Sequence, residues 1–494
     1  MKNLMTVGCA LCAVSAFALM EPATPESQGV SSEGILRFID ACEKTYDGGK
    51  MGAMHGFVIV RHGKVIAEGS WKPFDTLNET HMLFSHSKSF TSSAVGLLAD
   101  EGRVDIDERI VEIFSNDVPA KVSDNLSRLR VRDLLTMNAG KKDDLPGDGG
   151  NWVREFLASE FVRQPGQRFR YDSDATYMLA AIVEKRSGER MMDYLKRKMF
   201  DRIGITKAWS TCSPQGIPCG GWGMNMTTRE IARFGQLYLN RGKWEGEQVL
   251  SPFWVDLATA KHTETGRPAS TPDWAVGYGF QFWRCRHGAY RADGAGGQYT
   301  IVLPELDMVV SANAGCNNFQ MELNLVWDHL LPAVKDGPLP EDAAALARLR
   351  NRLTNLSIAP KRTASTAKIP WQRKFELKEN SRGVKSVEFA KTAGEGAAVR
   401  CTVVTRAGEQ TFRAGDGAWV KGDRIRIDPE NYEGLGLYIG EQTVAASCGV
   451  ESDGNFRLKA YLTGATAFLE FAVGADGKLT GRLWGMRGGT LESK

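Results

Sequence analysis

The first part of the chain alternates between polar and apolar positions in two short runs, 56–60 and 64–69, on either side of Arg61-His62-Gly63. Such alternation around a polar turn predicts a strand–turn–strand hairpin. An amphipathic helix is expected just before it, at 32–46. From the hairpin to about residue 261, apolar residues recur mainly at helical spacing. The predicted helices in that region are 129–137, 151–160, 175–187, 191–199 and 227–241.

Strand patterns return at 278–286, 298–303 and 308–312, and a last helical pattern follows at 320–331. The expected sheet therefore begins with one hairpin, is interrupted by a long helical excursion, and is completed by an antiparallel meander. Helices at the two ends of this region would cover the sheet. We predict an α+β domain over residues 24–335.

The pattern changes again after residue 335. Residues 336–370 hold Pro338, Pro340, Pro360 and Pro370 and one helical stretch near 341–351, which predicts a linker with one helix. From 371 to 494 the chain has short alternating runs divided by Asp-Gly pairs. Many short strands with such turns predict a small antiparallel β-barrel or sandwich domain. The expected strands are 399–405, 457–462, 467–473 and 479–484.

The N-terminus has the pattern of a secretory signal peptide over residues 1–18. Lys2 is the positive start, 4–17 the apolar core, and Ala16-Phe17-Ala18 the small-x-small cleavage site. We therefore expect an exported protein, located in a periplasm. The mature chain is expected to have no membrane span, because no later apolar run is long enough.

Charge and cysteine content bear on the partners, disulfides and metal sites that this chain can have. The net charge of +3 is close to neutral and gives no sign of a nucleic acid partner. Nine cysteines minus the two in the signal segment leave seven, so at least one is free in an oxidising compartment. Cys212 with Cys219 and Cys401 with Cys448 are possible pairs, and buried free thiols are the alternative. No Cys/His spacing resembles a zinc site.

Candidate chemistry begins with Ser85 and Lys88, at the start of an apolar run that ends at Gly102. The run predicts a helix from Ser85, and positions i and i+3 of a helix lie on one face, so Lys88 Nζ can reach Ser85 Oγ. A serine hydroxyl is a weak nucleophile until a base takes its proton. Lysine becomes such a base when burial lowers its pKa.

The Ser-x-x-Lys pattern is weak by itself, since about 1–2 matches are expected by chance in a chain of this composition. A second match, Ser365 with Lys368, lies in a polar, Pro-flanked segment and is interpreted as linker. The structural alternative for Ser85 and Lys88 is a helix cap followed by a solvated lysine.

Two further stretches could complete a site. Tyr171-Asp172-Ser173 opens a predicted helix, and a phenol near a lysine ammonium loses its proton more readily because the cation favours phenolate. The alternative is an aromatic residue before a helix cap. Residues 292–298 are rich in glycine and precede an apolar strand, which suits a backbone N–H that stabilises an oxyanion. The alternative there is a flexible hairpin loop.

The Ser-x-x-Lys pair, Tyr171-Asp172-Ser173 and the glycine-rich stretch follow one another in this order along the chain. In this order they resemble the motifs of the serine β-lactamase-like superfamily, which includes class C β-lactamases, penicillin-binding DD-peptidases, and related esterases and amide hydrolases. The resemblance spans residues 25–335, over half of the chain. The stretches that carry it are Ser85-His86-Ser87-Lys88-Ser89-Phe90-Thr91, Leu134-Leu135-Thr136-Met137-Asn138-Ala139-Gly140, Tyr171-Asp172-Ser173, Gly220-Gly221-Trp222-Gly223-Met224, Arg233-Phe234-Gly235-Gln236-Leu237 and Gly294-Ala295-Gly296-Gly297-Gln298.

The resemblance implies a β-lactamase-like fold, in which helices and a helical subdomain flank an antiparallel sheet. It implies covalent acyl-enzyme chemistry without a metal or cofactor. Ser85 would be the nucleophile, Lys88 its base and Tyr171 the acid/base partner. The backbone amides of Ser85 and Ala295 would form the oxyanion hole. Ser173 would hydrogen-bond Lys88 or substrate, and Asp293 and Gly294 are the other candidate substrate-binding positions.

The third motif departs from the family pattern. Where members usually carry Lys-Thr-Gly or His-x-Gly, this chain has Ala292-Asp293-Gly294. The missing cation normally binds a substrate carboxylate, so penicillin-like substrates are disfavoured. Asp293 would instead select an amine or hold the turn.

Three functions follow as hypotheses. The first is an exported serine hydrolase acting on small-molecule esters, small amides or peptides with D-residues. The second is a β-lactamase or DD-peptidase. The third is a catalytically silent peptidoglycan- or peptide-binding protein.

Overall fold

The computed structural model describes residues 20–46, 52–145, 150–364, 373–381, 383–392, 398–405, 408–426, 441–484 and 489–494. The predicted signal peptide and the second Ser-x-x-Lys match lie outside these residues, so export stays a prediction. Among the described residues, no helix combines the length and the apolar character needed to cross a membrane.

The centre of the first domain is an antiparallel sheet that, in the described part of the chain, has six strands in the order β2-β1-β11-β10-β9-β8. The hairpin of β1 (Gly52–Arg61) and β2 (Lys64–Ser70) forms as predicted. The chain then leaves the sheet and returns with β8 (Trp283–Arg284), β9 (Tyr290–Gly294), β10 (Gln298–Leu303) and β11 (Met308–Cys316). The interrupted sheet completed by a meander is therefore confirmed.

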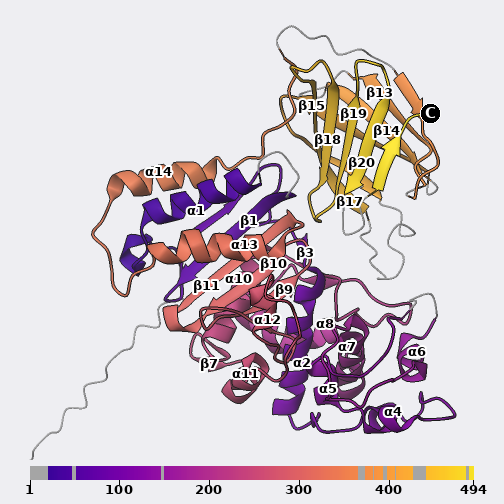
Figure 1. The fold of residues 1–494 in the computed structure, drawn as a ribbon. Coiled ribbons are helices and arrows are strands. Elements are labelled where there is room, and N and C mark those ends of the chain that lie inside the picture. Colours follow the sequence, from indigo (N-terminus) through magenta and orange to yellow (C-terminus); the bar gives the residue numbers. More distant parts are fainter. Residues whose placement is uncertain are drawn as a thin grey trace, which may run out of the picture.

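Helices cover both faces of this sheet (Figure 1). Alternate side chains of β1 point to opposite faces, so Phe57 and Ile59 join one apolar cluster and Val58 and Val60 the other. The first cluster includes residues of α1 (Ser32–Thr45), α13 (Phe319–Leu325) and α14 (Ala343–Thr354). The second includes residues of α10 (Thr228–Leu239).

The helix predicted within the linker is α14, but it belongs to the first domain. Leu349 and Leu356 are buried in the same cluster as α1, and the backbone N–H of Lys72 donates to the carbonyl of Leu356 at 3.0 Å. The prediction of 336–370 as a linker is therefore corrected for this helix. Its leucines lie against the sheet because β2 leaves an apolar face there to cover.

The helical excursion forms the lower lobe of Figure 1. The predicted helices 129–137, 151–160, 175–187 and 227–241 each form as one helix with ends shifted by up to two residues, and 191–199 is α-helical to Leu195 and π-helical over Lys196–Phe200. Besides α10, the described α-helices of this region are α2 (Ser87–Asp100), α3 (Ile110–Ile113), α4 (Asp124–Arg128), α5 (Val131–Leu135), α6 (Trp152–Ala158), α7 (Ser173–Ser187), α8 (Met191–Leu195), α9 (Asp201–Ile203), α11 (Pro252–Thr259) and α12 (Pro272–Ala275). Short strands β3 (His81–Met82), β4 (Trp209–Ser210) and β5 (Met224–Met226) form a small sheet in the order β3-β5-β4.

The predicted strand at 278–286 is wrong over most of its length. Only Trp283–Arg284 forms a strand, as β8, and Tyr278 contributes isolated bridges to Thr263 and Trp283. Gln281 has a left-handed backbone with φ of +66°, which turns the chain before the strand can form.

The C-terminal domain is a curled sheet that has ten strands among the described residues. Its order is β12-β13-β14-β15-β17-β18-β19-β20-β21, with β16 beside β17. Leu377 forms a bridge with Ser493, so the two edges of the sheet touch. The strands are β12 (Arg373–Glu376), β13 (Ser386–Lys391), β14 (Val399–Thr405), β15 (Gly408–Asp416), β16 (Val420–Arg426), β17 (Glu441–Val450), β18 (Phe456–Leu462), β19 (Phe468–Val473), β20 (Leu479–Trp484) and β21 (Gly489–Glu492).

The curled antiparallel sheet agrees with the prediction, apart from a short parallel pairing of β15 with β17. The three Asp-Gly pairs lie between strands as expected, with positive φ at Gly417, Gly454 and Gly477. The seven described cysteines are all free thiols, so neither of the two possible disulfides forms.

Candidate active site

Ser85 lies in a sharp turn at the entrance to α2. The predicted α-helix from Ser85 begins instead as a single 3-10 turn, Phe84–His86, and becomes α-helical at Ser87. Phe84 has φ of +49°, a left-handed conformation that costs energy for a bulky residue. The Ser87 hydroxyl fixes the turn, since it donates to the Phe84 carbonyl at 2.6 Å and accepts from Met224 N–H at 3.1 Å. Ser85 and Lys88 are three residues apart across the junction of this turn with α2, so their side chains lie on one face.

Lys88 is buried with its amine at the centre of the site. Its Nζ donates to Ser85 Oγ at 3.1 Å, to Ser173 Oγ at 3.0 Å and to the carbonyl of Gly221 at 2.5 Å. Burial lowers the pKa of Lys88 to about 7, although Asp172 and three other aspartates favour the charged form. A substantial fraction of the amine is therefore neutral near pH 7.

Gly221 is a site residue that the sequence analysis did not single out, although it lies within a quoted motif. A Cβ at this position would lie 2.6 Å from the Ser173 carbonyl oxygen and 3.4 Å from Lys88 Nζ. Only glycine lets this backbone approach the amine so closely.

Tyr171 contacts both members of the pair. Its hydroxyl hydrogen-bonds to Ser85, and its ring centroid lies 4.9 Å from Lys88 Nζ. Burial raises the pKa of Tyr171 well above its ordinary value, and Asp293 adds to this, against the opposing effect of the Ser85 hydrogen bond. The expectation that the lysine favours phenolate is therefore wrong for the resting site, because desolvation of the phenol outweighs it.

The N-terminus of α7 fixes the direction of Tyr171 and Ser173. Asp172 is the N-cap, and its carboxylate accepts from the backbone N–H groups of Asp174 at 3.0 Å and Ala175 at 3.3 Å. Lys141 lies next to this N-cap, with its Nζ 2.6 Å from Oδ2 of Asp174. The carboxylates of Asp144, Asp172 and Asp174 gather here, but Lys141 already supplies the cation. These contacts give no reason to place a metal there.

Gln281 joins three of the segments that carry the site. Its side-chain amide donates to the carbonyls of Leu134 and Leu135, and its side-chain oxygen accepts from Thr176 on α7. Its own carbonyl accepts from Ser89 on α2 at 2.7 Å. Nothing in the sequence pattern marks this glutamine, because its partners are distant in the chain.

The glycine-rich stretch forms the end of β9 and the turn into β10. A Cβ on Gly294 would lie 2.0 Å from the Leu83 carbonyl oxygen, so the strand passes directly beside the segment that leads to Ser85. Ala295 is the next residue, at the start of the turn. The position agrees with the expected second oxyanion donor, whose role stays a prediction.

Asp293 is already paired. The Arg291 guanidinium, which is fully buried, donates to the Asp293 carboxylate at 2.8 Å. Burial still raises the pKa of Asp293 overall. Of the two expected roles, holding the turn is the one this ion pair supports, and selection of a substrate amine stays a prediction.

Aromatic side chains line one side of Tyr171. The ring centroid of Trp283 lies 5.6 Å from that of Tyr171 in a stacked arrangement, and Tyr278 packs edge-on at 6.3 Å. Both come from the segment that was expected to be a continuous strand. The bend at Gln281 turns this segment so that its aromatic rings face the site.

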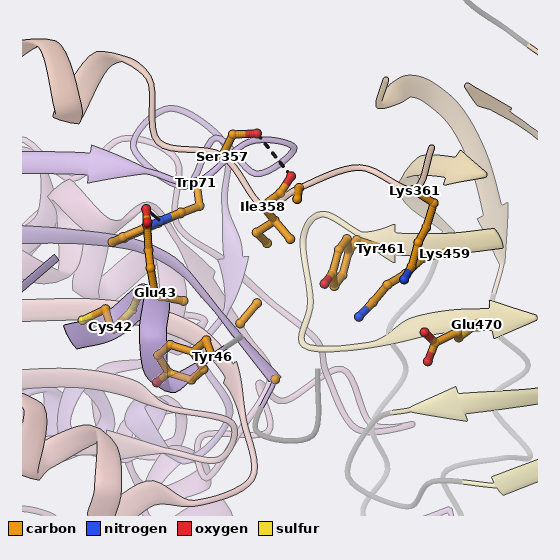
Figure 2. Close-up of a pocket in the computed structure, with 14 residues that line it drawn as sticks. Cys42, Glu43, Tyr46, Trp71, Ser357, Ile358, Lys361, Lys459, Tyr461 and Glu470 are labelled. Carbon is orange, nitrogen blue, oxygen red and sulfur yellow. Dashed lines mark hydrogen bonds between the residues drawn. The ribbon is translucent and has the colours of Figure 1, made fainter. Parts of the chain in front are cut away.

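A separate cavity of about 390 Å³ lies at the seam between the two domains rather than at Ser85. Figure 2 shows Trp71 and Tyr46 on one side of it and Tyr461, Lys459 and Glu470 of the C-terminal domain on the other. None of the expected site residues lines it.

Comparison with known proteins gives a consistent answer. The family model described as Beta-lactamase matches residues 39–321. The 6-aminohexanoate-dimer hydrolase of Paenarthrobacter ureafaciens is 26% identical over 325 residues, which cover 60% of this chain and 80% of that protein.

Two solved structures show the same fold. The octameric penicillin-binding protein homologue of Pyrococcus abyssi, 15% identical, matches 92% of this chain and 99% of its own with a TM-score of 0.50. EstCE1, a hydrolase with promiscuous acyltransferase activity, is 17% identical and matches 60% of this chain and 98% of its own, also with a TM-score of 0.50.

Proposed function

The chain belongs to the beta-lactamase family of hydrolases, and from this premise we propose that it cleaves esters or small amides through an acyl-enzyme on Ser85. The observation that carries the proposal is the hydrogen bond of 3.1 Å between Lys88 Nζ and Ser85 Oγ, with the lysine pKa lowered to about 7.

In the first step, neutral Lys88 takes the proton of the Ser85 hydroxyl as the oxygen attacks the substrate carbonyl carbon. The new C–O bond gives a tetrahedral intermediate whose negative oxygen would accept hydrogen bonds from the backbone N–H groups of Ser85 and Ala295. The carbonyl of Gly221 and the hydroxyl of Ser173 hold the ammonium that forms.

Collapse of the intermediate breaks the bond to the leaving group, which needs a proton. Tyr171 supplies it, because its raised pKa keeps the phenol protonated, and the Lys88 ammonium restores the phenol. Water then attacks the acyl-enzyme by the reverse sequence, with the neutral amine as base. The acid product leaves and Ser85 regains its proton.

The third motif favours small esters and amides over penicillins. Asp293 and Arg291 neutralise one another where a cation would bind a substrate carboxylate. The name of the Paenarthrobacter relative supports an amide substrate without a β-lactam ring. β-Lactamase or DD-peptidase activity is the alternative within the same family, and a silent binding protein is the alternative outside catalysis.

Labelling separates the three alternatives. Wild type and Ser85→Ala are each treated with a fluorophosphonate and with a labelled penicillin, and the intact mass is measured. We expect only the wild type to gain the phosphonyl group, because Ser85 Oγ bonds to phosphorus and fluoride leaves. We also expect the wild type, but not Ser85→Ala, to hydrolyse p-nitrophenyl esters. Penicillin labelling of Ser85 would instead support β-lactamase or DD-peptidase activity, and no labelling by either reagent would favour a binding protein.

A further inference from the structure

The C-terminal domain sends one turn into the first domain close to Ser85. This is the turn between β18 and β19, residues 463–467, called the barrel turn below. Its carbonyl at Gly464 accepts a hydrogen bond of 2.8 Å from the backbone N–H of Met82. Met82 is in β3, three residues before Ser85. The approach to the nucleophile is thus held by a domain that begins almost 300 residues later in the sequence.

The barrel turn also contacts the turn that carries Ala295. A Cβ added to Gly296 would lie 2.5 Å from Cγ2 of Thr466, so the two residues are packed without space between them. The Gly296 carbonyl accepts from Cys316 N–H at 2.8 Å on its other side. Gly296 is therefore held between β11 and Thr466, and Ala295 is its immediate neighbour.

The contacts around the barrel turn are buried and continuous. Thr463, Ala465, Thr466 and Ala467 are each less than a tenth exposed. Ala465 and Ala467 share one apolar cluster with Leu83 and Phe84, the residues just before Ser85. A domain attached only by a flexible linker would not bury this surface against the catalytic turn.

We propose that Thr466 is a positioning residue for the reaction at Ser85, acting through Gly296 on the oxyanion donor Ala295. The inference rests on the proposed function and gives the C-terminal domain a part in catalysis. The Cγ2 methyl of Thr466 sets how far the turn at Gly296 can move. A catalytic group displaced by about 1 Å costs up to about 100-fold in rate.

The test uses the full chain and changes only the methyl group. Thr466→Ser removes Cγ2 and keeps the hydroxyl, whereas Thr466→Val keeps a methyl at that position and removes the hydroxyl. Thr480→Ser makes the same chemical change at an exposed position of β20 in the same domain and is the matched control. The measurements are the rate of fluorophosphonate labelling per reactive site, the fraction of reactive sites, the kcat and KM for a p-nitrophenyl ester, and the melting temperature.

We expect Thr466→Ser to label all of its sites about tenfold more slowly and to lose kcat with little change in KM. Thr466→Val and Thr480→Ser should behave as the wild type, which separates the methyl contact from general stability. Wild-type labelling per site in Thr466→Ser would overturn the inference and leave the proposed function intact. A smaller fraction of reactive sites at an unchanged rate would show a structural role alone and also overturn it. A wild-type protein that no fluorophosphonate labels would overturn the proposed function and the inference together.

Discussion

Burial has opposite effects on two neighbouring side chains of the site. It disfavours the charged form of each, so it lowers the pKa of the Lys88 amine and raises that of the Tyr171 phenol. Near pH 7 the pocket therefore holds a base that is neutral in a substantial fraction of the molecules, and a neutral acid, both in contact with Ser85. This arrangement supplies both a base and an acid without a catalytic carboxylate. It also explains why Lys88 can accept a proton although aspartates lie nearby.

Tyr171→Phe tests the acid at this scale. The substitution removes the hydroxyl that bonds Ser85 and keeps the ring that stacks on Trp283, so the fold should persist. Loss of a general acid lowers turnover by about 100-fold to 10,000-fold. We expect kcat for an ester or amide to fall within that range, with a melting temperature close to that of the wild type.

Comparison of two substrates sharpens this test. A p-nitrophenyl ester has a good leaving group that needs little protonation, so Tyr171→Phe should harm its hydrolysis less than that of an amide. Equal losses for both substrates would contradict the assignment of Tyr171 as the acid for the leaving group.

At the scale of elements, the sequence predicts the main helices and most strands but not how they begin or bend. Periodicity finds α1 and α10, because each buries one face, whereas β1 and α7 are found from apolar residues that are buried almost throughout. It misses the 3-10 start before Ser87 and the left-handed backbone of Gln281. Both depend on partners far away in the chain, such as Met224 for Ser87 and Leu134 for Gln281. Deviations of this kind are expected where an element serves a site.

A buried pair of histidines, His55 on β1 and His81 on β3, makes the stability of this packing depend on pH. His55 Nδ1 and His81 Nε2 are 3.0 Å apart, and the other ring nitrogen of His81 faces the Met82 carbonyl at 3.0 Å. Burial lowers the pKa of His81 to about 4 and that of His55 well below its ordinary value. The unfolded chain therefore binds protons between about pH 6.5 and 4 that the folded chain does not.

We expect the free energy of unfolding to fall as the pH drops from about 6.5 to about 4, by up to about 1.4 kcal/mol per pH unit for each histidine. Urea unfolding across this range measures the slope. His81→Asn should flatten it, whereas His329→Asn, at an exposed position, should not. A slope in His81→Asn as steep as in the wild type would mean that other groups cause the loss.

At the scale of the whole molecule, the C-terminal domain contacts the first domain next to the site, through Gly464 and Thr466. The change from helical to short-strand patterns is visible in the sequence without coordinates, and the domain boundary drawn from it stays a prediction. Their seam is not predictable in the same way. The contact of Gly296 with Thr466 joins two glycine- and threonine-containing turns that look ordinary in sequence. The ion pair of Glu79 with Lys421 across the same seam likewise joins distant surface residues.

The residues of the site likewise divide into those that the sequence predicts and those that only the structure shows. Ser85, Lys88 and Tyr171 could be predicted from residue chemistry together with the family resemblance, and Ser173 from the resemblance alone, and the structure places the four together. Gly221 and Gln281 could not, because they act through backbone carbonyls and through partners that only the fold brings near.

The central claim is that a neutral Lys88 activates Ser85, and the pH dependence of acylation tests it most directly. The measurement is the rate of fluorophosphonate labelling of Ser85 from pH 5 to 9, corrected for the fraction of reactive sites. We predict a rise of about tenfold per pH unit below pH 7 and a plateau above it, because only the deprotonated amine accepts the serine proton. A rate that keeps rising towards the ordinary pKa of lysine, or that does not change with pH, would contradict the account.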